Sequence, residues 1–303
     1  MPSSGKEIKR KIKSINSTRQ ITKARELVAT SKMKKAVDNA VKLRAYGYLA
    51  FHILSKLSRK YTSMHKFFQK REVKNVLVMF FTADKGLCGG LNSNLFKRFL
   101  KMAPDVEKEG VKVTYLASGK KGAEFLRRIG KQVEYVFPAY SLNPKFKDIS
   151  PLSKIALKGF EKEEYDKVII IYPDFVSTLI QKPVMKTLLP FSFEVFSEML
   201  EELGSKFTKL VKPVDKDIDY KLEPSPMYVL ENIVPQLTEM QLFQAVLEMA
   251  ASEHSARMVA MQNATQAAND LLEDLTLTYN QARQAAITAE IAEIASAAST
   301  ALS

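Results

Sequence analysis

A glycine-rich turn is the first feature of this sequence that could take part in chemistry. The segment Thr82–Gly90 follows an apolar run typical of a strand and precedes a helix-favouring stretch. Main-chain N–H groups in such a turn can bind phosphate. The segment lacks the Gly-Lys-Ser/Thr ending of a P-loop and the three-glycine spacing of a dinucleotide-binding fingerprint. The pattern therefore favours a structural turn and leaves a nucleotide site as the alternative.

The histidines and the cysteine are weak candidates for a metal or nucleophilic site. His52, His65 and His254 lie far apart, and no two of them have metal-ligand spacing. Cys88 is the only cysteine, so an internal disulfide is excluded, and no evident base lies beside it to activate the thiol. No pair of carboxylates stands out either. We therefore expect no catalytic residue, no metal and no cofactor.

Charge is distributed unevenly along the chain. Residues 1–72 carry 19 Lys and Arg against 4 Asp and Glu, residues 73–223 carry 25 against 20, and residues 224–303 carry 2 against 9. The basic run that begins at Lys6 contains no aromatic residue before Tyr46, so it offers no base stacking to a nucleic acid. The surplus of positive charge suits an acidic partner.

Two long helices are expected, one at each end of the chain. Residues Ser4–Leu57 contain no proline, and Ser4 and Glu7 have the spacing of a capping box. A helix of that length would measure roughly 80 Å. Pro224-Ser225-Pro226 predicts a second start, and neither proline nor glycine follows Pro235, which allows roughly 100 Å of helix. Two long helices of opposite charge predict an antiparallel coiled coil.

The middle of the chain has the alternating pattern of an α/β domain. The expected strands are Val76–Ala83, Val111–Ala117, Val133–Phe137 and Val168–Tyr172, and the expected helices lie near Ser93–Met102, Lys120–Ile129 and Leu152–Lys162. This alternation predicts a mostly parallel, Rossmann-like sheet. Val176–Ile180 and Met185–Leu189 flank an expected turn at Gln181-Lys182-Pro183, and they predict an antiparallel pair at one edge.

The expected fold class is therefore α/β, with a long antiparallel coiled coil of N- and C-terminal helices and an inserted Rossmann-like domain. The expected boundaries are 1–72 for the first helix and its linker, 73–223 for the α/β domain and 224–303 for the last helix. No stretch of about 18 uncharged, apolar residues predicts a membrane span, and the N-terminus lacks the apolar core of a secretory signal.

Four segments carry a resemblance to a known family. Ile21–Met33 reads ITKARELVATSKM, Asp84–Asn94 reads DKGLCGGLNSN, Glu253–Thr265 reads EHSARMVAMQNAT and Leu277–Ile291 reads LTYNQARQAAITAEI. In this order they closely resemble the signatures of the F-type ATP synthase gamma subunit family, and the resemblance spans the whole chain.

The resemblance implies a role for the whole molecule. It implies a central rotor shaft that couples proton flow through a membrane sector to ATP synthesis or hydrolysis at beta subunits, without a catalytic site, cofactor or metal of its own. The implied partners are three alpha and three beta subunits, an epsilon subunit and the ring of c subunits, with no nucleic acid. The implied location is the cytoplasmic face of the bacterial plasma (inner) membrane, reached peripherally through the complex, with an organellar inner membrane as the weaker alternative.

The resemblance also implies contact residues. Those expected to meet the alpha/beta ring are Lys23, Arg25, Lys32, Arg257, Arg283, Gln284 and Thr288. Those expected near the c ring are Leu222 and Glu223. Many family members carry methionine where this chain has Arg25, so we hypothesise that Arg25 adds an ionic contact to the ring.

Two other functions remain open at this point. A nucleotide-dependent α/β enzyme would bind nucleotide through the Gly86–Gly90 turn, but it leaves both long helices unexplained. A coiled-coil scaffold could bind nucleic acid through the basic N-terminal helix, and that binding would weaken with salt.

Overall fold

The computed structural model describes residues 5–61, 66–107, 109–141, 144–191 and 223–301 of the chain, without the side chains of residues 41, 44–61, 226 and 298–301. The chain divides into two compact units. Unit 1 comprises Met1–Ala29 and Met258–Ser303, and unit 2 comprises Thr30–Arg257. Helix α1, Gly5–Tyr61, and helix α6, Pro226–Ala301, each contribute to both units.

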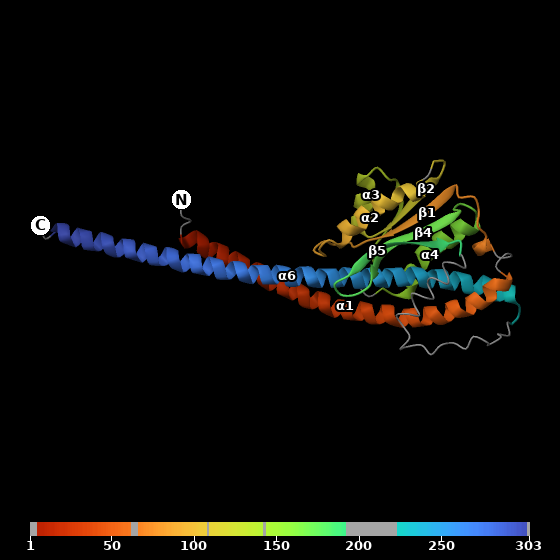
Figure 1. The fold of residues 1–303 in the computed structure, drawn as a ribbon, viewed down its shortest axis with the longest axis horizontal. Helices are drawn as coiled ribbons and strands as arrows, with labels where there is room; N and C mark the ends of the chain where they lie inside the picture. The colour runs from red at the N-terminus through yellow and green to blue at the C-terminus, as the bar shows by residue number, and fades with distance from the viewer. Residues whose placement is uncertain (1–4, 62–65, 108, 142–143, 192–222, 302–303) are drawn as a thin grey trace. The chain divides into compact units, whose positions relative to one another are not determined.

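A five-stranded sheet forms the centre of unit 2 (Figure 1). Its strands are β1 (Asn75–Phe81), β2 (Lys112–Ser118), β3 (Val133–Phe137), β4 (Lys167–Phe175) and β5 (Gln181–Leu189). The order is β3-β2-β1-β4-β5, with β1 to β4 parallel and β5 antiparallel at the edge. Along the chain, the parallel strands are connected by helices α2 (Leu91–Val106), α3 (Lys120–Arg128) and α4 (Phe146–Glu161). The predicted mixed α/β architecture is confirmed, and we call this sheet with α2, α3 and α4 the sheet domain.

Alternate residues of the strands point to opposite faces of the sheet and contribute to two separate apolar cores. Val76, Val78 and Phe80 of β1 face α2 and α3, where Phe80, Phe99 and Phe125 form an aromatic cluster. These two helices pack side by side against one face of the sheet (Figure 1). The buried strands read as continuous apolar runs because both faces of a parallel sheet are covered.

The opposite face packs against α4 and the first half of α6. Leu77, Met79 and Phe81 of β1 join one apolar cluster with side chains from both helices. The α4 members are Ile149, Leu152, Ala156 and Phe160, and the α6 members are Leu230, Val234, Leu237, Met240, Leu242, Ala245, Val246 and Met249. This part of α6 is therefore a core element of unit 2.

The predicted start of α6 is confirmed. The Ser225 hydroxyl accepts a hydrogen bond from the Tyr228 N–H at 3.2 Å, and Pro226 is the first helical residue. Proline suits that position because it lacks the N–H that would have no partner there. Pro235 lies inside α6 near its beginning and does not end it. The other predicted cap, Ser4, lies outside the described residues.

The predicted edge hairpin needs one correction. Val176–Ile180 was expected to be a strand, but it is the turn between β4 and β5, and its hydrogen bonds link Val176 and Ser177 to Ile180 within the turn. The residues expected to form the turn, Gln181–Pro183, instead begin β5. Apolar, β-branched composition misled the prediction because the pairing partner, not propensity, decides which residues join a ladder. Pro183 is tolerated in β5 because this strand lies at the sheet edge.

Unit 1 contains one segment from each long helix, and the two segments run antiparallel. The Thr265 hydroxyl donates to the Thr22 hydroxyl at 2.9 Å, and Arg19 Nη1 donates to Asn269 Oδ1 at 3.4 Å. Moving back along α1 therefore means moving forward along α6. This direction agrees with the predicted antiparallel pairing of the chain ends.

Candidate functional site

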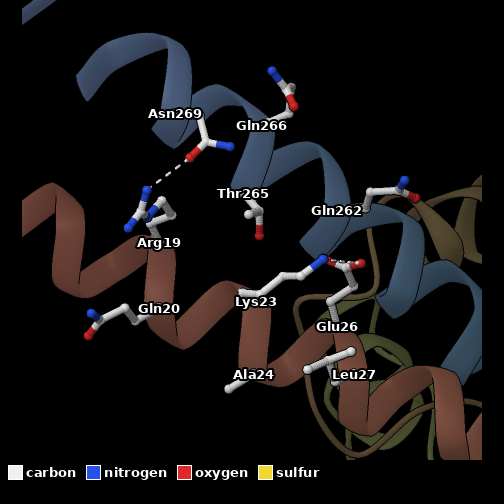
Figure 2. A pocket seen from close by; sticks show the side chains of 10 residues that line it. All are labelled: Arg19, Gln20, Lys23, Ala24, Glu26, Leu27, Gln262, Thr265, Gln266 and Asn269. Carbon is white, nitrogen blue, oxygen red and sulfur yellow. Dashed lines mark hydrogen bonds and ion pairs between the residues drawn. The ribbon is translucent and has the colours of Figure 1, made fainter. Parts of the chain in front are cut away.

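A groove lined mainly by polar and charged residues runs between the two helices of unit 1. Figure 2 shows its lining side chains, and the groove has a volume of about 620 Å³. From α1 it is lined by Arg19, Gln20, Lys23, Ala24, Glu26 and Leu27, and from α6 by Gln262, Thr265, Gln266 and Asn269. Such a surface offers many hydrogen-bonding groups but no cluster that could carry out acid–base or nucleophilic chemistry.

The charges in this groove are partly satisfied within α1. Lys23 Nζ lies 3.1 Å from Glu26 Oε1, one helical turn away. Arg19 reaches across to Asn269, as described above. Arg25 is exposed on the same helix. In this pair 55% of the Lys23 side chain but only 14% of the Glu26 side chain is exposed, so the lysine is the more accessible partner.

Exposed apolar side chains accompany the polar groups of unit 1. On α1 these are Ile21, Leu27 and Val28, and on α6 they are Leu271, Leu277, Ile287, Ile291 and Ile294. The last three follow helical spacing, so they share one side of α6. Large apolar residues gathered on a surface are typical of protein–protein contacts.

Most of the expected contact residues lie on exposed surface. Arg283, Gln284 and Thr288 are exposed on successive turns of α6, and the Thr288 hydroxyl donates to the Gln284 carbonyl at 3.0 Å. Lys32 is exposed in unit 2, as is Glu223 near the start of α6. Leu222 lies outside the described residues. These side chains are therefore exposed, each within its own unit.

Arg257 differs from the other expected contact residues because its side chain is used inside unit 2. Its Nη2 lies 2.8 Å from Glu253 Oε1 and donates to the carbonyls of Gly86 at 3.3 Å and Lys85 at 3.4 Å. Only 14% of the Arg257 side chain and 3% of the Glu253 side chain are exposed. The arginine therefore ties α6 to the glycine-rich turn.

The glycine-rich turn is held from two further directions. Asp84 Oδ1 accepts a hydrogen bond from the Lys120 N–H at 2.8 Å, and Asp84 Oδ2 accepts one from the Ala139 N–H at 3.2 Å. The backbone enters the left-handed region at Gly89, with φ of 55°. These contacts join the carboxyl ends of β1, β2 and β3, so they support the structural interpretation of the turn.

The cysteine and the histidines are the remaining candidates for chemistry, and those that the structure describes lie in surroundings that favour a structural role. Burial raises the pKa of Cys88 above its usual value, although the nearby Arg257 guanidinium lowers it, so the thiol is poorly suited to act as a nucleophile. His254 Nε2 donates to the Ser141 carbonyl at 2.9 Å, and burial lowers the pKa of the ring. His65 and the His52 side chain lie outside the described residues.

Within the described part of the chain, no group of three or more His, Cys, Asp or Glu side chains could hold a metal ion. The same residues contain no helix that is both long enough and apolar enough to cross a bilayer.

Comparison with known sequences decides the family. A sequence model described as ATP synthase matches residues 4–302. The ATP synthase gamma chain of Herpetosiphon aurantiacus is 39% identical over 304 residues, covering 97% of this chain and 98% of that one. This chain belongs to the ATP synthase gamma chain family. A second gamma chain, from Legionella pneumophila (strain Paris), is 37% identical over 290 residues, covering 95% of this chain and 96% of the other.

Solved structures agree with this family assignment. A chain of the Tetrahymena thermophila mitochondrial ATP synthase central stalk and c-ring has a TM-score of 0.57 and 25% identity, covering 80% of this chain and 99% of that one. A chain of the Euglena gracilis mitochondrial ATP synthase, in a structure of OSCP, F1 and c-ring, has a TM-score of 0.63 and 20% identity, covering 98% and 94%. The second likeness concerns the fold alone.

The intrachain contacts of α6 were not among the features expected from the sequence. Ser252, Glu253 and His254 are buried polar residues in one helical turn, and Ser252 Oγ donates to the Pro173 carbonyl at 2.9 Å. The sequence contains one signal of this turn, a run of polar residues in a segment otherwise dominated by Ala, Leu and Met. The carbonyls that accept from Ser252 and His254 are distant in sequence, so the pattern could not identify them.

Proposed function

We propose that this gamma chain is the central rotor shaft of an F-type ATP synthase and couples proton flow through the membrane sector to ATP synthesis or hydrolysis at the beta subunits. The observation that carries the proposal is the match to the family over residues 4–302, together with about 39% identity to relatives named as gamma chains. In this role the chain has no catalytic site of its own. It acts by presenting different faces to the three beta subunits as it turns, which biases each site towards a different nucleotide affinity.

The paired helices would form the rigid part of the shaft as an antiparallel coiled coil. The Thr22–Thr265 and Arg19–Asn269 contacts support the antiparallel direction. Alanines on α6 support close approach of the helices because a small side chain lets the backbones come near. Continuous hydrogen-bonded helix resists bending and twisting, as a shaft that transmits torque requires.

The exposed surface of unit 1 would contact the alpha/beta ring. Lys23 and Arg25 of α1 would meet acidic groups of beta, and Lys32 would do so from unit 2. Arg283, Gln284 and Thr288 would contribute from α6. The side of α6 that carries Ile287, Ile291 and Ile294 would turn against an apolar sleeve, since apolar contacts are non-directional and do not hold one angle.

Arg257 would act in this assembly mainly from inside unit 2. Its bonds to Glu253 and to the carbonyls of Lys85 and Gly86 occupy the guanidinium. A direct contact between Arg257 and the ring would have to replace these bonds.

The partners would be three alpha and three beta subunits, an epsilon subunit and the c ring. Solved relatives come from structures described as central stalk with c-ring, and as OSCP, F1 and c-ring, which supports this set. Leu222 and Glu223 would lie near the c ring. The chain would sit peripherally on the cytoplasmic face of a bacterial plasma membrane, held there through the complex. The boundaries at 72–73 and 223–224 stay as proposed limits of the α/β domain.

Reconstitution tests the proposal. We expect this chain, mixed with alpha and beta subunits, to form a complex with one copy per three alpha–beta pairs, and we expect ATP hydrolysis to depend on it. Size-exclusion chromatography with mass measurement gives the stoichiometry, and phosphate release gives the turnover. If the chain stayed apart from a competent ring, or hydrolysed ATP alone, the shaft proposal would be wrong.

A further inference from the structure

One stretch of α6 is enclosed by protein on every side. All eleven residues from Ala245 to Ser255 are buried, so this part of the helix has no solvent-facing side. Several of its contacts involve small apolar side chains, such as Ala250 and Ala251 against Ala36 of α1. Larger members of the stretch, such as Val246 and Met249, belong to the apolar cluster, and their close packing favours one rotation of the helix about its axis. Apolar contacts lack a preferred direction, so hydrogen bonds can fix that rotation further.

Three hydrogen bonds from residues 252–257 of α6, at the end of this stretch, supply such fixed directions. Ser252 Oγ donates to the Pro173 carbonyl in β4, and His254 Nε2 donates to the Ser141 carbonyl beyond β3, each at 2.9 Å. Arg257 Nη2 donates to the Gly86 carbonyl beyond β1 at 3.3 Å. The acceptors belong to three separate segments of the sheet domain. Turning α6 by one residue, about 100°, would break all three bonds because a hydrogen bond requires a narrow range of angles.

The same turn contains polar atoms that packing does not explain. Glu253 Oε2, His254 Nδ1 and Ser255 Oγ are buried without a hydrogen-bond partner within the described chain. Apolar residues of similar size would avoid the cost of burying these atoms. Their presence indicates that this turn is not arranged for stability alone.

We propose that Ser252, His254 and Arg257 are positioning residues that fix the rotational register of α6 against the sheet domain, so that torque passes between them without slip. This inference rests on the proposed shaft function. In that role α6 carries torque along the shaft, and its rotation must be fixed relative to the sheet domain of unit 2. Each of the three bonds adds a fixed direction to the close packing of the apolar cluster, and so resists rotation about the α6 axis.

The experiment uses assembled ATP synthase in lipid vesicles and measures protons pumped per ATP hydrolysed. The matched pair is His254→Leu, which removes the donor, and His254→Gln, whose amide can donate in place of Nε2. Ser252→Ala removes a different bond of the same set with the loss of one hydroxyl. We expect His254→Leu and Ser252→Ala to lower the pumping ratio by about two- to tenfold, the equilibrium factor of one net hydrogen bond. His254→Gln should restore most of the ratio.

The outcomes separate this inference from a structural effect and from failure of the proposed function. A merely structural loss would lower assembly and hydrolysis together and would leave the ratio unchanged. If His254→Leu does not assemble, Ser252→Ala carries the test. A wild-type ratio in Ser252→Ala, or an equal loss in His254→Gln and His254→Leu, would overturn the positioning role. Failure of the wild-type chain to assemble or to support pumping would instead overturn the shaft function.

Discussion

His254 stays neutral in the folded chain because its ring is buried and because Arg257 and Lys32 oppose a further positive charge nearby. These effects lower its pKa from 6.5 and outweigh the Ser141 carbonyl and Glu253, which raise it. The unfolded chain therefore binds a proton more readily than the folded chain. The contribution of this residue to stability is complete above about pH 6.5 and is lost as the pH falls towards the lowered pKa.

The pH dependence of unfolding tests this residue. We expect the free energy of unfolding of the wild type, measured with urea, to fall relative to His254→Gln between pH 7.5 and pH 5.5, since glutamine does not titrate. The comparison with the variant removes the contribution of other titrating groups. A wild type that gains stability relative to the variant on acidification would show that the ring is protonated in the folded chain.

Arg25 is exposed on α1, and its contact with the ring is a hypothesis that one substitution can test. If Arg25 makes an ionic contact with the ring, Arg25→Met should change the ratio of ATP turnover to proton pumping by up to about fivefold, the range of an exposed ion pair. The measurement is made on assembled synthase at low and high salt, and the difference should shrink at high salt. Arg10→Met, another exposed arginine of α1, is the control. If Arg25→Met has the same ratio of ATP turnover to proton pumping as the wild type, the hypothesis is wrong.

At the scale of elements, the connection from β2 to α3 depends on one glycine. Gly119 has φ of 106°, and a Cβ there would lie 2.1 Å from the Thr82 carbonyl oxygen. The close approach lets the Thr82 hydroxyl accept a hydrogen bond from the Gly122 N–H at 2.8 Å. Thr82, which follows β1, therefore packs directly against the start of α3, and only a residue without a Cβ leaves room for this contact at Gly119.

Replacing Gly119 should therefore destabilise unit 2. We expect Gly119→Ala to lower the free energy of unfolding by at least about 2 kcal/mol, from backbone strain and the clash together. Gly86→Ala is the matched control, because nothing lies within 4 Å of a Cβ at that position. Its effect should stay within about 0.5 kcal/mol. Equal stability of the two variants in urea unfolding would show that the turn relaxes around an added Cβ.

At the scale of the whole molecule, the reaction rate of the Cys88 thiol can be used to measure how often unit 2 opens. It is the only cysteine of the chain, it is 2% exposed, and it lies beside the Arg257–Glu253 pair. Because the thiol is buried, a reagent can reach it only when this part of unit 2 opens or unfolds. The reaction rate thus measures the population of open states.

We expect a thiol reagent to label Cys88 in the native chain at least about 100-fold more slowly than in the urea-unfolded chain, because the thiol is both buried and poorly ionised. Spectrophotometric titration at pH 8 gives both rates. The unfolded chain is the internal control for reagent activity. Rapid stoichiometric labelling of the native chain would contradict the close packing of α6 against the turn.

The sequence alone determined the features that depend on neighbours along the chain. Ser225 and Pro226 mark a helix start because their capping chemistry is local, and the strands β1 and β4 are visible because residues buried on both faces read as unbroken apolar runs. The family signatures at Ile21–Met33 and Leu277–Ile291 likewise lie in continuous stretches. Fold class, long helices and family therefore followed from the sequence.

The tertiary structure decided the features that depend on residues far apart. It placed Val176–Ile180 in a turn, because only the pairing of β4 with β5 sets which residues join the ladder. It also gave Arg257 partners 171 and 172 residues away, the carbonyls of Gly86 and Lys85. Main-chain carbonyls are present in every residue, so no residue type marks them in a sequence as the acceptors of a particular side chain.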